Sequence, residues 1–423
     1  MKIGVIGTGI SSLVASYCLC NDHELSIFDS GNYIGGHTNT IDVQYEGESH
    51  QVDSGFIVFN EPNYPHFCNL MKRLGVAWQP TEMSFSVRCD LSNLEYNGTG
   101  INRLFAQRRN ILKPRFLKMI SDILRFGKQA STILATASDQ LTVQEYVDRE
   151  KYSESFTNHY LIPLGASLWS CPAESFRKFP IRFVVEFLDN HCMLQIGGRP
   201  IWRVIQGGSK QYIPAITKQF KERIRLNARV KSVKRFPDHV ELILHDGRRE
   251  SFDQVIIGCH ADTALAMLSD PTPTERELLS AFPYQFNQAI LHADTSVLPK
   301  RKLAWASWNY RLNKNSGHQA TVTYNMNRLQ SLKSNHTFCV TLNDDTGIDP
   351  TKIIRRIDYH HPIYTANRST AQKRHPEVIM QNRTSFCGAY WGYGFHEDGV
   401  KSGLAVANAF GGGLTGHPAA RPS

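Results

Sequence analysis

The chain has 423 residues with a formal net charge of +9, and 41% of the residues are hydrophobic. This length predicts two or three domains with cores of ordinary size. No run of 18 apolar residues occurs, so we expect no membrane-spanning helix, and the nine cysteines match neither a disulfide framework nor a zinc-binding spacing. The positive charge comes without a nucleic-acid-binding motif. We therefore expect a cytoplasmic protein with free thiols, no metal site and no nucleic-acid partner.

The start of the chain has the pattern of a strand, a glycine turn and a helix. Lys2–Ile6 is a short apolar run, Gly7-Thr8-Gly9 is a tight turn, and apolar residues then recur at helical spacing. Such a turn lets a phosphate approach the backbone, where the free N–H groups of the helix start can bind it. Ser12 stands at the third fingerprint position, where glycine or alanine is usual. The predicted phosphate-binding residues are Gly7, Gly9, Ile10, Ser11 and Ser12.

A second predicted strand, Glu24–Asp29, ends in a carboxylate 22 residues after Gly7. In a dinucleotide-binding fold, an acidic residue at this place accepts hydrogen bonds from the ribose hydroxyls of the adenosine. Asp29, with Ser30 beside it, is therefore the predicted ribose site. An ordinary strand–helix–strand unit with a tight turn is the alternative.

A second glycine pair follows this strand. Gly35 and Gly36 precede His37 and Thr38, in a segment whose hydroxyl and amide side chains are suited to hydrogen-bonding a diphosphate. A further turn, Val52–Ile57, contains Gly55 and Phe56 at the end of a short predicted strand. These four residues and the two of the later turn join the predicted cofactor site.

This order of motifs resembles the flavin-binding half of the flavin-containing amine oxidoreductase superfamily. The resemblance implies bound FAD, with its diphosphate at the second glycine pair. Near the other end, Thr384–Tyr390 is a predicted buried strand, and Gly394–Gly399 leads into an apolar helical pattern that begins at Val400. This segment is similar to the family's C-terminal FAD motif, in which a helix start faces the flavin pyrimidine ring. It implies contacts from Gly388, Phe395, His396, Asp398, Gly399 and Val400.

Three strand-like segments between these motifs, 223–230, 240–245 and 254–258, predict a small meander that returns to the main sheet. The resemblance places the adenine at Val230 and the return of the sheet beneath the cofactor at Gly258.

The predicted fold class is α/β, with a Rossmann-like FAD-binding domain interleaved with an α+β substrate domain. Residues 1–75, 200–265 and 383–411 are assigned to the first domain. Residues 76–199 and 266–382 are assigned to the second, and 412–423 to a flexible tail. The first insertion is predicted to be mainly helical, for example at 141–149, and the second contains strand-like segments at 288–292, 320–324 and 338–342.

Residues 103–128 contain eight lysines and arginines and one acid, Asp122, with apolar residues interleaved at helical spacing. This pattern is typical of a basic interfacial helix that contacts an anionic membrane from the cytoplasmic side. A solvated helix packed on the substrate domain is the alternative.

The chemistry of the substrate side is less defined. Aromatic residues around Tyr390 and Tyr393 predict one wall of a water-poor pocket, and Trp305, Trp308 and Tyr310 another. Because neighbouring side chains of a strand point to opposite sides, His360 and His361 are not expected to bind a metal together. His396 is the candidate catalytic residue, because the motif places it beside the flavin. A structural hydrogen bond is the alternative role for His396.

More narrowly, the segments "GGHTNT", "LWSCP" and "FCGAYWGYGFHEDG" resemble a bacterial branch of FAD-binding proteins often encoded beside cyclopropane-fatty-acyl-phospholipid synthases. This resemblance implies an FAD-dependent oxidoreductase that transfers a hydride from a substrate C–H bond, desaturating or otherwise oxidising a lipid acyl chain. The alternatives are an amine oxidase and a flavin-bound accessory protein of lipid modification. The sequence does not identify the electron acceptor.

Overall fold

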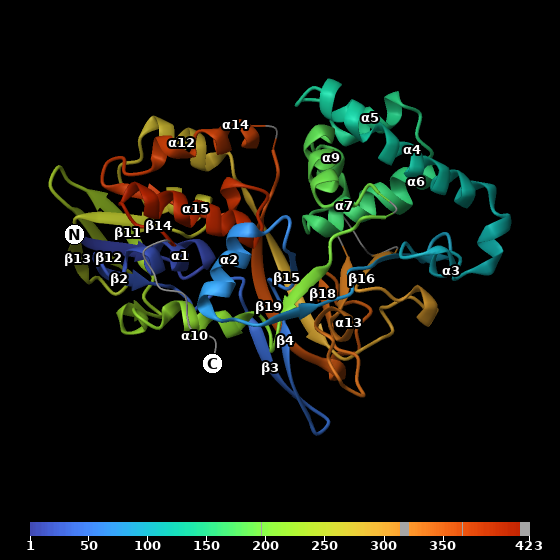
Figure 1. Ribbon diagram of the computed structural model, residues 1–423, viewed down its shortest axis with the longest axis horizontal. Coiled ribbons are helices and arrows are strands. Elements are labelled where there is room, and N and C mark those ends of the chain that lie inside the picture. Colours follow the sequence, from blue (N-terminus) through green and yellow to red (C-terminus); the bar gives the residue numbers. More distant parts are fainter. Residues whose placement is uncertain (196, 314–320, 366, 415–423) are drawn as a thin grey trace.

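The computed structural model describes residues 1–195, 197–313, 321–365 and 367–414 (Figure 1). The molecule is elongated, and one region lies on the left of Figure 1. This region contains the cofactor motifs from the N-terminal part and from the C-terminal part of the chain. A second region, with a large sheet and a group of helices, lies on the right. The mixed α/β architecture agrees with the predicted fold class.

A parallel sheet with the strand order β10-β2-β1-β14-β20 forms the centre of the first region. All four neighbouring pairs are parallel, and β1 and β14 are buried almost throughout, as expected for a parallel sheet covered on both faces. Helices α1 (Ile10–Leu19) and α15 (His396–Ala409) pack together beside it. The strands are β1 (Lys2–Ile6), β2 (Glu24–Phe28), β10 (Ile224–Arg225), β14 (Gln254–Ile257) and β20 (Thr384–Phe386).

The unusual Ser12 of the glycine fingerprint fits because Gly258 faces it. Ser12 is fully buried in α1, and a Cβ atom added at Gly258 would overlap the Ser12 hydroxyl. Gly258, directly after strand β14, therefore supplies the small residue that α1 lacks at Ser12. The helix and the sheet can still approach each other closely.

Two predicted strands have different bounds in the structure. The segment 223–230 is divided, because β10 joins the parallel sheet whereas β11 begins only at Val230. The antiparallel meander consists of β11 (Val230–Arg235), β12 (Val240–Leu244) and β13 (Arg249–Phe252), and the third predicted strand belongs to the parallel sheet as β14. The strand predicted at 384–390 ends at Phe386, and Ala389–Trp391 forms the 3-10 turn η8.

The second region contains a seven-stranded sheet with the order β19-β15-β18-β17-β16-β7-β8. Its strands come from both predicted insertions, because β7 (Phe85–Cys89) and β16 (Trp308–Leu312) pair in parallel. The remaining strands are β8 (Leu94–Asn97), β15 (Tyr284–His292), β17 (Val322–Asn325), β18 (Cys339–Leu342) and β19 (Ile353–Pro362). Ala320, the start of one predicted strand, lies outside the described residues.

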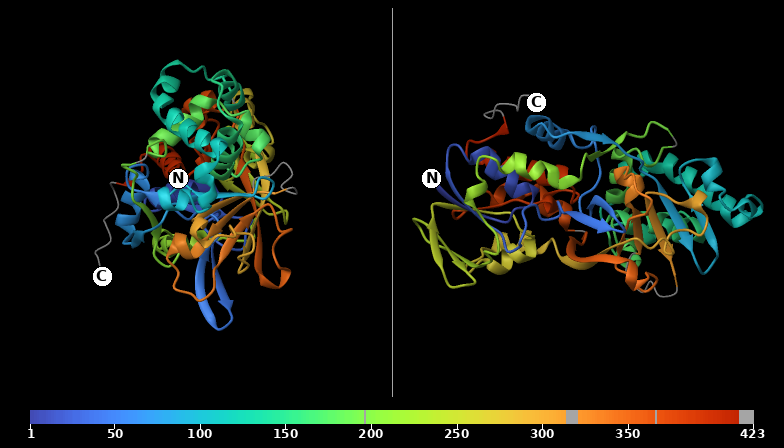
Figure 2. Two further views of the ribbon diagram at one scale, coloured as in Figure 1. Left: turned by 90° about the vertical axis from the view of Figure 1, so that its right-hand side faces the viewer. Right: turned by 90° about the horizontal axis from the view of Figure 1, so that it is seen from below.

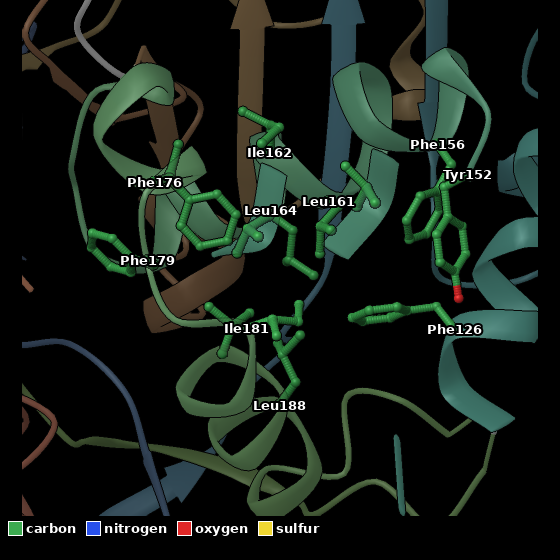
Figure 3. Close-up of a cluster of buried hydrophobic side chains, with 14 of the residues drawn as sticks. Phe126, Tyr152, Phe156, Leu161, Ile162, Leu164, Phe176, Phe179, Ile181 and Leu188 are labelled. Atoms are coloured by element: carbon green, nitrogen blue, oxygen red, sulfur yellow. The ribbon is translucent and has the colours of Figure 1, made fainter. Parts of the chain in front are cut away.

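Helices of the first insertion cover one side of this region, above the sheet in Figure 1. They enclose an aromatic and aliphatic cluster, shown in Figure 3, in which the Tyr152 and Phe156 rings stack 4.6 Å apart. The helices are α4 (Pro114–Thr136), α5 (Val143–Arg149), α6 (Glu154–Phe156), α7 (Ile162–Leu168), α8 (Ala173–Arg177) and α9 (Ile181–Asn190), with the π-helical turn η2 (Thr157–Leu161) between α6 and α7.

The remaining strands and helices are smaller. They are the hairpin β3 (Thr40–Tyr45) and β4 (Glu48–Asp53), the small sheet of β5 (Phe59–Asn60), β9 (Trp202–Ile205) and β6 (Trp78–Pro80), and the helices α2 (Pro65–Leu74), α10 (Tyr212–Thr217), α11 (Ala261–Met267), α12 (Pro273–Ser280), α13 (Met326–Gln330) and α14 (Arg368–Lys373). Among the described residues, no helix is long and apolar enough to cross a membrane.

The predicted domain boundaries stay a prediction, but two helices pack across them. Helices α12 and α14 lie within the segment assigned to the substrate domain, 266–382. Leu278 of α12 and Ala371 of α14 nevertheless belong to the same buried cluster as Val255 of β14. Most of the predicted tail, from residue 415 onward, lies outside the described residues.

The basic segment 103–128 is not one helix. It is divided into the end of α3 (Ile101–Leu104), the 3-10 turn η1 (Arg108–Leu112) and the first part of α4. Lys113 is extended with φ −95° and ψ 108°, and Pro114 is the first residue of α4. A residue before proline is disfavoured in helical conformation, whereas proline fits the first helical position, so the sequence stops one helix and starts another there.

Candidate cofactor and substrate site

A cavity of about 530 Å³ is lined by residues from both regions of the molecule. One part of its lining comes from the ends of the parallel strands and the turns that follow them. The other part comes from the large sheet and from α7 and α9. Sixteen of the predicted site residues line it: Gly7, Gly9, Ile10, Ser11, Asp29, Ser30, Gly35, Gly36, His37, Gly55, Phe56, Val230, Gly258, Gly388, Phe395 and His396.

The glycine turn leaves the start of α1 open toward the cavity. Gly7 has φ +100°, a conformation that favours glycine, and a Cβ atom there would lie 3.1 Å from the Gly258 carbonyl oxygen. Gly9 is different, because it has φ −66° and no atom lies within 4 Å of the place of its Cβ. Gly9 therefore leaves free space where a ligand can reach the N-terminus of α1, which no side chain caps.

Asp29 is tied to this turn. Its Oδ2 accepts hydrogen bonds from the Thr8 backbone N–H at 2.7 Å and from the Thr8 hydroxyl at 2.6 Å, and its Oδ1 accepts from the Gly31 N–H at 2.7 Å. The Asp29 backbone also bonds Arg225 and Ala228, which places the carboxylate beside the start of β11. The carboxylate thus holds the turn and lies in the cavity wall near Val230.

The second glycine pair packs directly on the first turn. A Cβ atom at Gly36 would lie 3.5 Å from Gly9 Cα, and a Cβ atom at Gly55 would overlap the His37 carbonyl oxygen. That oxygen accepts a hydrogen bond from the Phe56 N–H at 2.7 Å. Segments that are about 30 and 50 residues away in the chain are thus brought to the N-terminus of α1, because glycine permits each close approach.

His396, the candidate catalytic residue, begins α15 and lies in the cavity wall. Its Nε2 is 3.0 Å from the Thr38 hydroxyl and 3.2 Å from the Tyr212 hydroxyl, and its ring stacks on Phe56. Burial, with a smaller effect of His37, lowers the pKa of His396 well below its ordinary value. The imidazole is therefore neutral, with Nε2 engaged by two hydroxyls. This geometry favours the structural hydrogen bond, and a role in proton transfer stays a prediction.

Five predicted residues lie behind the cavity wall. Thr38 bonds Tyr212 and His396, and the Asp398 Oδ2 accepts a hydrogen bond from the Phe395 N–H at 3.0 Å. Burial raises the pKa of Asp398 to about 6. Ser12, Gly399 and Val400 are buried in the contact between α1 and α15, where a Cβ atom at Gly399 would lie 2.6 Å from Ile10. These residues position the two helix starts rather than facing the cavity.

Sequence reasoning missed a group of histidines in the cavity lining. His260, His360 and His361 join His37, whose ring centroid is 6.1 Å from that of His260 and 5.3 Å from that of His361. Burial and the neighbouring imidazoles lower the pKa of both His37 and His361 to about 3. Strand β19 contributes both His360 and His361 to the lining of the cavity. Among the described residues, no metal-binding cluster occurs.

A buried cation behind the last motif was also missed. The Arg368 Nη2 donates to the carbonyl oxygens of Tyr390 at 3.1 Å and Gly392 at 2.6 Å, and the Gln372 side-chain amide donates to the same two oxygens. Both residues lie on α14, and they fix the turn between β20 and α15. No motif marks them, since their role depends on how α14 packs against a turn that follows it in the chain.

The part of the cavity away from the glycine turn is aromatic and uncharged. Tyr390, Tyr393, Phe395 and Trp308 line it as expected, whereas Trp305 and Tyr310 do not. Further lining residues that were not predicted are Met83, Trp169, Phe187, Met193, Trp202, Tyr324, Leu342 and Tyr364. Among the described lining residues, Asp29 is the only carboxylate and Arg229 the only lysine or arginine, and both lie at the glycine-turn end.

The open helix start, the acidic residue at the end of the second parallel strand and the cavity that extends from them define a dinucleotide-binding α/β fold with an attached substrate region. The model of the flavin containing amine oxidoreductase family matches residues 10–330. The chain belongs to this family and is an FAD-dependent oxidoreductase.

Solved structures with the same fold cover nearly the whole chain. Cyclohexylamine oxidase from Brevibacterium oxydans IH-35A is 14% identical, with a TM-score of 0.68 over 96% of this chain and 98% of its own. A fatty acid isomerase from P. acnes that produces CLA is 14% identical, with a TM-score of 0.67 over 96% and 98%. A putative protoporphyrinogen oxidase from Exiguobacterium sp. 255-15 is 13% identical, with a TM-score of 0.66 over 97% and 98%. No curated protein matches the sequence.

The cavity fits FAD. The space left free at Gly9 and the uncapped start of α1 suit a diphosphate, and the Asp29 carboxylate suits ribose hydroxyls. The start of α15, with Phe395 and His396 in the cavity wall, presents a second positive helix end, which suits the flavin ring. The donor set of the cavity therefore matches both ends of the cofactor.

We expect Asp29→Ala to weaken FAD binding by about 1.5–3 kcal/mol, the range for hydrogen bonds that involve a charged group. The loss has two sources, because the variant removes an acceptor for the ribose and three hydrogen bonds that hold the turn. FAD affinity is measured by titrating the apoprotein and following flavin fluorescence. Thr8→Val, which removes the hydroxyl bond to Asp29 and the bond that this hydroxyl accepts from the Gly35 N–H at 3.3 Å, is the control for the turn. Unchanged affinity in a folded Asp29→Ala protein would contradict the ribose assignment.

Proposed function

We infer that this FAD-dependent oxidoreductase acts on an uncharged apolar substrate, and that the substrate is a lipid acyl chain that is desaturated or otherwise oxidised. The observation that carries the proposal is the uncharged aromatic wall of the cavity. Bound FAD supplies the two-electron acceptor, which takes a hydride from a substrate C–H bond. Gly9, Gly36 and Asp29 hold its adenosine diphosphate half in this proposal, and the start of α15 holds its flavin half.

The energetics favour a neutral chain over an ion. Each buried methylene contributes about 0.8 kcal/mol to binding in an apolar environment. An ammonium or carboxylate placed in the same wall would lose several kcal/mol of hydration. Neither Asp29 nor Arg229 compensates that loss, because both lie at the glycine-turn end. The wall therefore selects the hydrocarbon part of a molecule and leaves any charged group outside.

An amine oxidase is the second candidate. Aromatic side chains such as Trp169 and Tyr393 also attract cations over their ring faces. The shared fold with cyclohexylamine oxidase is consistent with this reading, although at 14% identity it indicates the fold alone. The acyl-chain proposal and the amine proposal differ in which compound reduces the enzyme.

Anaerobic mixing of the holoprotein with candidate substrates tests the proposal. We expect phospholipids or fatty acyl esters to bleach the flavin absorbance, and primary and cyclic amines to leave it unchanged. Reduction by amines alone would replace the acyl-chain proposal by an amine oxidase. Reduction by neither, in a protein whose flavin dithionite still reduces, would favour an accessory role without turnover.

A charged variant makes the test sharper. Met193→Asp places a carboxylate in the aromatic wall, whereas Gln195→Asp adds the same charge two residues away at an exposed position outside the cavity. We expect Met193→Asp to slow flavin reduction by an acyl substrate at least tenfold, because a charge must then be desolvated against the chain. Gln195→Asp should be unaffected. Equal rates in both variants would show that the substrate does not occupy this wall.

A further inference from the structure

Large hydrophobic side chains are exposed at the end of the molecule away from the parallel sheet. Among the described residues, twelve such side chains are exposed, and five of them lie between residues 101 and 124. Leu112 is 85% exposed and Ile101 79%. Figure 1 and the right-hand view of Figure 2 both place this segment at the far end of the long axis from the N-terminus. The concentration at one end indicates an interaction surface rather than scattered exposure.

The local structure explains why these side chains are not buried. Helix α4 packs Phe116, Met119 and Phe126 into the helical core, so Leu117 between them points to solvent. The preceding pieces are too short to form a second buried face. No residue of α3 is buried, and η1 buries only Asn110. The break at Pro114 thus turns an amphipathic sequence into one anchored helix and an exposed apolar tip.

The same tip is strongly basic. Residues 101–118 contain no acidic residue, and Arg108, Arg109 and Arg115 are exposed. Arg108 and Arg109 bond only amide and carbonyl oxygens. Asp122, the one acid of α4, is already paired with Lys118 and Arg125. Of the cations in 101–118, Arg103 is paired with Glu82 and Lys118 with Asp122. Within the described part of the chain, the other cations of this segment, Arg108, Arg109, Lys113 and Arg115, form no ion pair with a carboxylate.

A second segment, distant in the sequence, enlarges this tip. The 3-10 turn η5 (Lys302–Ala304) lies beside α3. This turn contains the exposed Lys302 and Leu303, and the exposed Lys300 lies just before it. Arg301 between them is paired with the buried Glu95. We call residues 101–118 and 300–303 together the basic tip.

We propose that the basic tip docks the protein on the surface of a bilayer that contains anionic lipid headgroups. The exposed leucines and isoleucines would enter the boundary between headgroups and acyl chains, and the cations would face the phosphates. Both features are required, because an acidic protein or a nucleic acid would engage the cations without burying the leucines. The proposal does not depend on the substrate, since docking is measured without turnover.

Vesicle binding tests the proposal with the holoprotein. We expect co-sedimentation with phosphatidylglycerol-containing vesicles, little with pure phosphatidylcholine vesicles, and a decrease as salt rises. The variant K113Q/R115Q/K300Q removes three cations that make no side-chain hydrogen bond or ion pair within the described residues. Each cation near an anionic surface contributes about fivefold to binding, so the variant should bind about a hundredfold more weakly.

Matched variants separate a specific surface from net charge. K218Q/K221Q/K231Q removes three exposed lysines near α10 and β11, at the other end of the molecule in Figure 1, and should bind like the unchanged protein. L112S, with all cations retained, should bind at least tenfold more weakly, because its apolar contact is lost. FAD content should be the same in all three, since none of these residues lines the cavity.

Three results would overturn the proposal. One is that the unchanged protein does not sediment with anionic vesicles at low salt. Another is that both triple variants lose binding equally, since that would reveal attraction by net charge alone. The third is that L112S binds the vesicles as tightly as the unchanged protein, which would favour a soluble polyanion as the partner.

Discussion

Gly9→Ala should weaken FAD binding by roughly 10- to 100-fold and leave the apoprotein folded. The position of the missing Cβ is empty, with no protein atom within 4 Å, and it faces the cavity at the start of α1. A methyl group there contacts nothing in the apoprotein but occupies the space through which a diphosphate reaches the helix N–H groups. Overpacking by one methyl group at a close contact costs about 1–3 kcal/mol.

The backbone permits this substitution. Gly9 has φ −66° and ψ 167°, which any residue adopts, so the free energy of unfolding of the apoprotein should fall by no more than about 1 kcal/mol, the preference for glycine over alanine at a helix N-cap. Gly197→Ala, at an exposed position with equally free space for a Cβ atom, is the control. The measurements are FAD titration and urea unfolding of the apoprotein. If Gly9→Ala binds FAD normally, the diphosphate does not approach α1.

Gly403→Ala should lower the free energy of unfolding by about 1–3 kcal/mol. Gly403 lies in α15 where this helix crosses α1, and an added Cβ atom would overlap the Ser11 carbonyl oxygen and lie 3.1 Å from Val14 Cβ. A backbone oxygen cannot rotate away as a side chain can, so the two helices must separate. Helix propensity alone predicts the opposite sign, because alanine stabilises a helix interior by about 1 kcal/mol relative to glycine.

The sign of the effect therefore tests the close helix contact directly. Gly98→Ala, where the added Cβ atom would meet only a carbonyl oxygen at 3.9 Å, is the control and should be nearly neutral. Because both helix starts lie at the cavity, Gly403→Ala should also weaken FAD binding, measured as a smaller thermal shift on adding FAD. A stabilised Gly403→Ala protein would show that α1 and α15 do not pack as closely as described.

The two variants distinguish two uses of glycine in one site. At Gly403 and Gly258 the missing side chain allows protein to pack on protein, so stability should respond first. At Gly9 it leaves room for the cofactor, so affinity should respond while stability does not. The apoprotein and the holoprotein together separate these cases, because only a loss at the ligand contact depends on FAD being present.

The sequence by itself determined which residues meet at the glycine-turn end of the cavity. The strand, glycine turn, helix, second strand and acid are consecutive, so their spacing places Gly7, Gly9 and Asp29 together in any right-handed strand–helix–strand unit. The C-terminal motif was also readable, although α15 begins at His396, before the apolar pattern that starts at Val400. Element ends were less exact, as at Phe386 and Val230, where short strands depend on neighbours far away in the chain.

Only the tertiary structure decided the rest. The histidine group unites His37, His260, His360 and His361 from three distant segments, and no local pattern reports such a meeting. The uncharged wall is assembled in the same way from α7, α9 and the large sheet. The basic tip depends on both the sequence and the tertiary structure. The composition of residues 103–128 predicted a basic segment, but the burial of Phe116 and the exposure of Leu112 follow from how α4 packs. Periodicity tells which residues share a face, whereas contacts between distant segments determine whether that face is covered.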